Sequence, residues 1–336
     1  EQYLQRRLHS AKMLAHYLIM SCLRSSRSAL AEHIVGTKEA VEQFSLQGFS
    51  KQNETGNVLL KIQEMAGSVP ENRVSIELPD WLSDPVAHEQ ACRHDAEIYR
   101  QIYQRVKEMS AGRELTKARH LLKMLLKHDL VLAFDSRLIS LEAIKGMIHE
   151  QSPNIKTMIA TGEDERAKER LVDVFKPGSN KKKIIGLCSD SLSEGVNLQQ
   201  ASAVALLDMP SVVRIAEQRV GRVDRMDSPH KSIDVWWPED AEEFAVSSDE
   251  RFIERLETVA NLLGSNMPLP VEKAQKQGVA VKAREFIEEY ERSTEISSWD
   301  GITDAYEPVR RLVEGDDALV EGDVYERYKK ITARVL

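Results

Sequence analysis

The stretch KIIGLCSDSLSEGVNLQQASAVALLDMPSVVRIAEQRVGRVDRMD, residues 183–227, decides the fold. Two apolar runs within it, 184–188 and 203–207, are short enough to be buried strands. The second run ends at Asp208 and a nearby proline, which cannot continue a central strand. A polar turn with one glycine, 189–197, separates the runs, and a segment rich in arginine follows. This order predicts an α/β fold that presents polar groups at the carboxyl edge of a parallel sheet.

Two arginines give the sharpest functional signal. Arg222 and Arg225 are three residues apart, so they would share one face of a helix or helical turn. Arginine suits phosphate because its planar, permanently charged guanidinium donates paired hydrogen bonds. Gly221 permits close backbone approach, and Gln218 adds a neutral donor and acceptor one turn earlier. A solvated basic helix face is the alternative interpretation.

Both halves of this stretch resemble known motifs. QRVGRVDR, residues 218–225, resembles motif VI (Q-x-x-G-R-x-x-R) of superfamily-two helicases and translocases, and SEGVNLQ, residues 193–199, resembles their motif V. The run is most similar to the Swi/Snf-related branch, including the bacterial RNA-polymerase-recycling ATPases. The resemblance covers residues 115–237. It implies the second RecA-like lobe of an ATP-driven motor, the helicase C-terminal lobe, in which helices flank a parallel sheet.

The resemblance also implies roles for individual residues around ATP. Arg222 and Arg225, with Gln218, would be the catalytic residues, since in this family they reach the γ-phosphate of ATP as it departs. The nucleotide itself would be contacted by Glu194, Gly195, Asn197 and Gly221. ATP and Mg²⁺ are the implied cofactors, and both would be bound mainly by a first lobe that the sequence lacks.

The resemblance also implies nucleic-acid contacts, which follow three predicted strands at their carboxyl ends. They are Ser136 and Arg137 after 131–134, which resemble motif IV, Thr161 and Gly162 after 156–160, and Ser189 after 184–188. Such groups contact the backbone and read no base sequence. Serine, threonine and aspartate at these points are equally suited to cap the next helix. The Swi/Snf-related resemblance favours DNA over RNA as the partner.

The sequence lacks the parts that bind and activate ATP. None of its sixteen glycines is followed by lysine, so the P-loop signature is missing, and no predicted strand leads into a D-E-x-H-like box. The chain begins with Glu1 rather than methionine, which we interpret as a piece of a longer protein. We therefore expect an ATP-dependent helicase or translocase in the full-length parent, with the first RecA-like lobe as a partner, and negligible hydrolysis by this chain alone.

Three domains are predicted along the chain. Residues 1–112 form a helical connector between lobes, with helices at 1–36 and 81–109, residues 113–240 form the lobe, and residues 241–336 form a helical extension with an acidic tail. LRSSRSAL, residues 23–30, is similar to a basic segment of related translocases. It would either couple the lobes or begin a helix with serine caps.

Charge and composition bound the remaining possibilities. The net charge is −8, but residues 285–326 hold fourteen acidic and three basic residues, so the remainder is slightly basic. The acidic tail could bind protein partners. Three widely spaced cysteines are typical of a reducing compartment, and no apolar run is long enough for a membrane span. Together with the resemblance, these features favour a bacterial cytoplasmic protein.

Two other interpretations stay open from the residues alone. The chain could be a non-catalytic module that kept the fold and binds nucleic acid or a protein partner. It could also be the lobe of an RNA-remodelling helicase. Cys92, His94 and His88 lie close in sequence, but without a second ligand pair we interpret them as part of a surface helix and predict no metal site.

Overall fold

The computed structural model describes residues 2–46, 48–49, 51, 54–72, 77–162, 164–193, 196–208, 213–225 and 228–238. Within these ranges, helices occupy the chain up to residue 127, and a five-stranded sheet with its own helices follows. The predicted helical extension and acidic tail, 241–336, lie outside the described residues.

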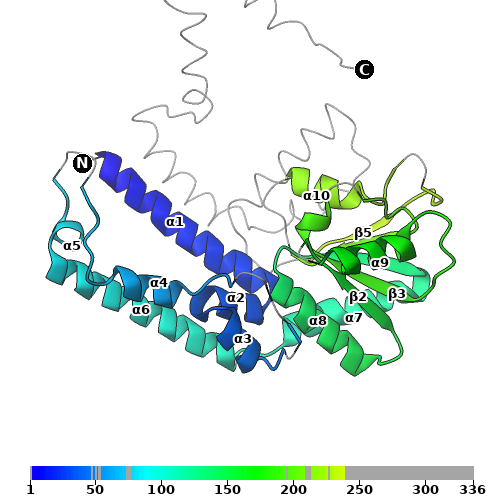
Figure 1. Ribbon diagram of the computed structural model, residues 1–336, viewed down its shortest axis with the longest axis horizontal. Helices are drawn as coiled ribbons and strands as arrows, with labels where there is room; N and C mark the ends of the chain where they lie inside the picture. The colour runs from blue at the N-terminus through cyan, green and yellow to red at the C-terminus, as the bar shows by residue number, and fades with distance from the viewer. Residues whose placement is uncertain are drawn as a thin grey trace, which may run out of the picture. The chain divides into compact units, whose positions relative to one another are not determined.

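The sheet is parallel throughout, and its strand order is β2-β3-β1-β4-β5. Figure 1 labels β2, β3 and β5 of this sheet. Its strands are β1 (Leu130–Phe134), β2 (Lys156–Ala160), β3 (Ile184–Cys188), β4 (Ala203–Leu206) and β5 (Asp234–Trp236). The four runs expected as strands, at 131–134, 156–160, 184–188 and 203–207, are all strands, and the α/β fold of a RecA-like C-terminal lobe is confirmed. Because every strand runs the same way, the loops after them gather at one edge.

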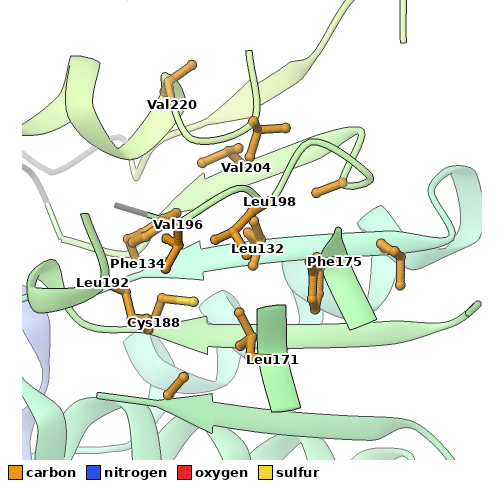
Figure 2. Close-up of a cluster of buried hydrophobic side chains, with 14 of the residues drawn as sticks. Leu132, Phe134, Leu171, Phe175, Cys188, Leu192, Val196, Leu198, Val204 and Val220 are labelled. Atoms are coloured by element: carbon orange, nitrogen blue, oxygen red, sulfur yellow. The ribbon is translucent and has the colours of Figure 1, made fainter. Parts of the chain in front are cut away.

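Helices cover both faces of the sheet. They are α7 (Gly112–Lys127), α8 (Leu138–Gln151), α9 (Glu165–Phe175) and α10 (Val213–Val220). Leu132 and Phe134 of β1 pack with α9 and α10 in one apolar cluster, shown in Figure 2. Val131 and Ala133, one residue out of phase, pack with α7 and α8 in a second cluster. Burial on both faces explains why β1, β3 and β4 are continuous apolar runs rather than alternating ones.

Six helices precede this lobe in the described residues. They are α1 (Gln2–Ser25), α2 (Arg27–Val35), α3 (Thr37–Gln43), α4 (Val58–Met65), α5 (Asp80–Ser83) and α6 (Pro85–Glu108). The helical stretch 1–36 contains a break, where the serine-capped helix start expected as one alternative for 23–30 is confirmed, and the helix predicted over 81–109 is also broken. Ser26 ends the first break by accepting a hydrogen bond from the Ala29 amide, and Asp84 caps α6 beside a proline at its first position.

The helical region has a core of its own that includes one residue of the lobe. Cys22, Leu30 and Ile34 are buried with Tyr103 of α6. Ile139, from the first turn of α8, is fully buried in the same cluster. The helical region and the lobe therefore share apolar surface at the start of α8, directly beside the loop after β1.

Gly56 packs its backbone directly against the backbone of α2. Its backbone has φ +84°, and a Cβ there would lie 2.1 Å from the carbonyl oxygen of Glu32. The Glu32 carboxylate is buried and bound by the Thr37 hydroxyl at 2.7 Å and the Lys51 ammonium at 2.6 Å. The Gly56 backbone therefore contacts the backbone of a residue whose side chain is also held. Glu32 has little room to move away from an added Cβ.

Gly56→Ala should destabilise the chain more than Gly178→Ala, which is the matched control. Gly178 has φ +81° but open space around its added Cβ, so it isolates the left-handed backbone penalty, about 1–2 kcal/mol. The clash at Gly56 should add about 1–3 kcal/mol. Urea unfolding followed by circular dichroism measures both, and equal losses would show that the Glu32 contact is not held.

Candidate functional site

Four loops meet at the carboxyl edge of the sheet. Asp135 follows β1, Thr161 follows β2, Ser189 follows β3 and Asp208 lies just beyond β4. Asp135, Ser189 and Asp208 are all buried. Burying two carboxylates at one edge is unfavourable unless each gains hydrogen bonds or a cation, so their partners define the site.

Arg219 of α10 is the cation that faces Asp208. Its side chain is fully buried, and its Nη1 donates to Asp208 Oδ1 at 2.7 Å. Its Nε donates to Asp190 Oδ1 at 2.6 Å, in the short 3-10 helix that follows β3. Burial opposes the charge on Arg219, but the two carboxylates raise its pKa above the ordinary value. Burial likewise opposes the charge on Asp208, yet Arg219 holds its pKa below the usual range. One guanidinium therefore fixes α10 to the ends of two strands.

The loop after β1 is held by two aspartates. Asp208 Oδ2 accepts the backbone N–H of Ser136 at 3.0 Å, and Asp135 Oδ1 accepts that of Arg137 at 2.8 Å. Asp135 also accepts the hydroxyl of Ser25, at 2.5 Å, from the end of α1. Burial and the nearby Asp208 charge raise the pKa of Asp135 to about 7, although Lys117 partly offsets them.

The two arginines singled out in the sequence lie beyond the helix. α10 ends at Val220, so Arg222 is in the following turn and Arg225 in the next bend. Of the two placements expected, a helix or a helical turn, the helix is excluded, because both arginines follow the end of α10. Arg222 is half-buried, and its carbonyl accepts the N–H of Leu198 at 3.2 Å. Arg225 is exposed, with Nε donating to the Gly221 carbonyl at 3.1 Å.

The candidate nucleotide contacts are only partly described. Gln218 is half-buried on α10, and Asn197 is exposed. A Cβ on Gly221 would lie 2.8 Å from the carbonyl of Glu217, so glycine is required by the tight turn that ends the helix. Glu194 and Gly195 lie outside the described residues.

The candidate nucleic-acid contacts differ in exposure. Ser136 and Gly162 are exposed, Arg137 and Thr161 are half-buried, and Ser189 is buried at 4% exposure. The structure thus gathers all five at one edge of the sheet, because each follows a parallel strand. Ser189 is placed there as part of the packed interior rather than of the surface.

The most strongly held groups at this edge are ones that the sequence did not single out as functional. Arg219 lies inside the arginine-rich motif, and Asp190 and Asp208 follow apolar strands, but Asp208 was interpreted only as a strand end. A signal was present, since an aspartate directly after a buried strand needs a partner. The partner of both aspartates, however, is Arg219 of α10, which lies 29 and 11 residues away in the sequence.

Two further sequence features have plain outcomes. In the part of the chain that the structure describes, no three His, Cys, Asp or Glu residues are grouped so that they could hold a metal ion. None of the described helices is long and apolar enough to cross a membrane.

Arg219→Ala should destabilise the chain by about 3–5 kcal/mol, because it leaves buried Asp208 without its cation. Arg225→Ala removes the same charge from an exposed position and should change stability by no more than about 0.5 kcal/mol. Chemical unfolding measures both. Similar losses for the two variants would contradict the buried ion pair.

Asp135→Asn should make stability less dependent on pH. The native Asp135 carboxyl keeps its proton up to about pH 7, whereas its ordinary pKa is 3.8, so between these values the native state binds more protons than the unfolded state. Asp135 therefore contributes stability at low pH that is lost as the pH rises to about 7. The variant, neutral throughout, should gain stability relative to the original chain over this window and level off above it.

Unfolding curves at a series of pH values test this. A difference between variant and original chain that stays constant from pH 4 to pH 8 would show that the Asp135 carboxyl titrates normally.

Comparison with known proteins gives one family match. The helicase conserved C-terminal domain matches residues 116–227, one third of the chain. None of the curated proteins matches.

Several solved structures are similar at low identity. The C-terminal part of the Fun30 ATPase domain is 16% identical with a TM-score of 0.33, covering 60% of this chain and 74% of that one. UvsW of T4 is 16% identical with a TM-score of 0.35, covering 66% of this chain and 37% of UvsW. The RNA helicase Prp28 from Chaetomium thermophilum is 16% identical with a TM-score of 0.36, covering 48% and 37%. This chain spans little more than a third of the last two proteins.

The family match and the sheet agree on one region. Residues 116–227 contain most of α7, strands β1 to β4, and helices α8 to α10, together with every candidate site residue. Residues 116–227 therefore match the helicase conserved C-terminal domain and fold as a parallel sheet flanked by helices.

Proposed function

We propose that this chain is the C-terminal motor lobe, with its helical connector, of an ATP-dependent DNA translocase or helicase of the Swi/Snf-related branch. One observation carries the proposal, which is the division of labour among the motif arginines. Arg219 is fully buried against two carboxylates, whereas Arg225, six residues on, is exposed. The buried guanidinium fixes the helix, and the exposed one is available to an external phosphate.

In this proposal Arg222 and Arg225 act as arginine fingers on ATP bound by another lobe. Gln218 and Asn197 lie on the segments that flank them, and Gly221 lets the backbone turn between helix and arginines. Bound Mg²⁺ would neutralise the phosphate charge that develops during transfer. The sequence contains no P-loop, so the first lobe must supply the cradle for ATP and the metal ligands.

The same edge would hold the nucleic acid through its backbone. Ser136 and Gly162 are exposed where β1 and β2 end, with Arg137 beside them. Polar groups and backbone N–H groups of this kind contact phosphates without reading bases. ATP binding would close the two lobes and hydrolysis would reopen them, so a different grip in each state moves the strand. The resemblance of the motifs to the Swi/Snf-related branch favours DNA.

ATP turnover by the full-length protein tests the proposal. DNA should stimulate turnover, and Arg222→Ala or Arg225→Ala should lower kcat by about 10³–10⁵-fold, the size of an arginine-finger contribution. Arg93→Ala is the matched control, because Arg93 is an exposed arginine of α6, at 74% side-chain exposure, and should leave kcat unchanged. The 336-residue chain alone should hydrolyse ATP negligibly.

Three results would contradict parts of this proposal. Stronger stimulation by RNA than by single-stranded or duplex DNA would reassign the lobe to RNA remodelling. Full activity of Arg225→Ala and Arg222→Ala would remove the finger role and favour a non-catalytic module. Measurable turnover by the isolated chain, abolished by Arg222→Ala, would refute the need for another lobe.

A further inference from the structure

A run of buried hydroxyls joins the helical region to the carboxyl edge of the sheet. Ser26 Oγ lies 2.6 Å from Ser140 Oγ, and Ser140 Oγ lies 2.7 Å from Ser25 Oγ. The Ser25 hydroxyl then donates to Asp135 Oδ1 at 2.5 Å. All four residues are fully buried, so water cannot replace any of these bonds.

The donation from Ser25 to Asp135 Oδ1 fixes the direction of the other hydrogen bonds in this run. A serine hydroxyl has one proton, and that of Ser25 is used on Asp135, so Ser25 must accept from Ser140. Ser140 has then used its proton and must accept from Ser26. The oxygen of Ser26 in turn accepts the Ala29 amide at 3.0 Å, as the cap of α2. One consistent chain of donation therefore runs from the start of α2 to Asp135.

The chain continues across the edge of the sheet through the loop after β1. Asp135 holds the N–H of Arg137, and Asp208 holds the N–H of the adjacent Ser136. Asp208 is the principal partner of Arg219. Two consecutive peptide groups are thus bound by two different aspartates, one connected to the helical region and the other to α10.

Helix α7 holds the other side of the same junction. Lys117 Nζ donates to the carbonyls of Arg24 at 2.8 Å and Ser25 at 2.7 Å, at the carboxyl end of α1. Glu114 Oε1 accepts the backbone N–H of Arg27 at 2.7 Å, at the start of α2. A cation at a helix C-terminus and an anion at an N-terminus both complement the helix dipole. The break between α1 and α2 is therefore gripped from both sides rather than left to hinge freely.

We propose that the α1–α2 junction is a positioning element, in which Ser25, Ser26 and Ser140 set the loop of Ser136 and Arg137 and, through Asp208, the placement of α10. Neither Ser25 nor Ser140 is among the candidate contacts to ATP or nucleic acid, so both would act through Asp135. The consequence of this positioning element for activity rests on the proposed function. In that function the loop contacts nucleic acid, and α10 leads into the turn that carries Arg222 and Arg225. A shift of the helical region would then move both the loop of Ser136 and Arg137 and helix α10.

Hydrogen–deuterium exchange of the 336-residue chain tests the positioning directly. Ser25→Ala should speed amide exchange about tenfold at residues 136–137, and should also speed it at 213–225, which Ser25 does not touch. Ser25→Thr, which keeps the hydroxyl, should restore slow exchange. Ser202→Ala is the matched control, because Ser202 Oγ bonds His128 Nδ1 at 2.9 Å beside the opposite, amino edge of the sheet. It should leave both segments unchanged.

A purely local role has a different signature. Faster exchange confined to residues 20–30 in Ser25→Ala, with 136–137 and 213–225 unchanged, would overturn the proposal. If Ser25→Ala does not fold, amide exchange at 136–137 and 213–225 is measured in Ser140→Ala instead.

This measurement needs neither ATP nor nucleic acid, so it separates the two proposals. In the full-length protein Ser25→Ala should in addition reduce stimulation of ATP turnover by DNA about tenfold. Coupled exchange without any DNA-stimulated turnover would sink the proposed function and leave the positioning element standing. DNA-stimulated turnover, with exchange at 213–225 no faster in Ser25→Ala than in the original chain, would support the proposed function and overturn the positioning element.

Discussion

A buried guanidinium is tolerated only when its charge is matched and its donors are used, and Arg219 imposes that condition on this lobe. It binds Asp208 and Asp190, which follow two different strands, so α10 can pack only where both carboxylates are in reach. The helix then ends at Val220 and the chain turns at Gly221. Arg225 is exposed as a result of where this pair holds the helix.

The same logic of matched charge extends along the carboxyl edge. Asp208 shares its second oxygen with the Ser136 amide, while Asp135 accepts the neighbouring amide and the hydroxyl of Ser25. Parallel strands bring these loops together, and buried polar partners then fix them relative to one another. The helical region therefore contributes to the arrangement of the edge, through α1 and α2, although it supplies none of the candidate ligand contacts.

Much of the fold could be predicted from sequence because a strand buried on both faces has a continuous apolar sequence. The run 184–188, which is buried throughout, is a strand with those bounds, and so is the partly buried run 156–160. The serine-capped helix start within 23–30 was one of two expectations and is confirmed at Ser26, whereas the helix break at Asp84 was missed. Arg219 was overlooked because its burial depends on carboxylates 11 and 29 residues away, which no local pattern reveals. The roles of Arg222 and Arg225 stay predictions.

Chemical labelling of arginine side chains tests the central claim most directly. A dicarbonyl reagent that modifies accessible guanidinium groups, followed by peptide mass spectrometry of the folded chain, compares Arg219 and Arg225 within one molecule. The account predicts rapid modification of Arg225 and strong protection of Arg219, which reacts only after unfolding. Modification of Arg219 at a rate similar to that of Arg225 in the folded chain would contradict it.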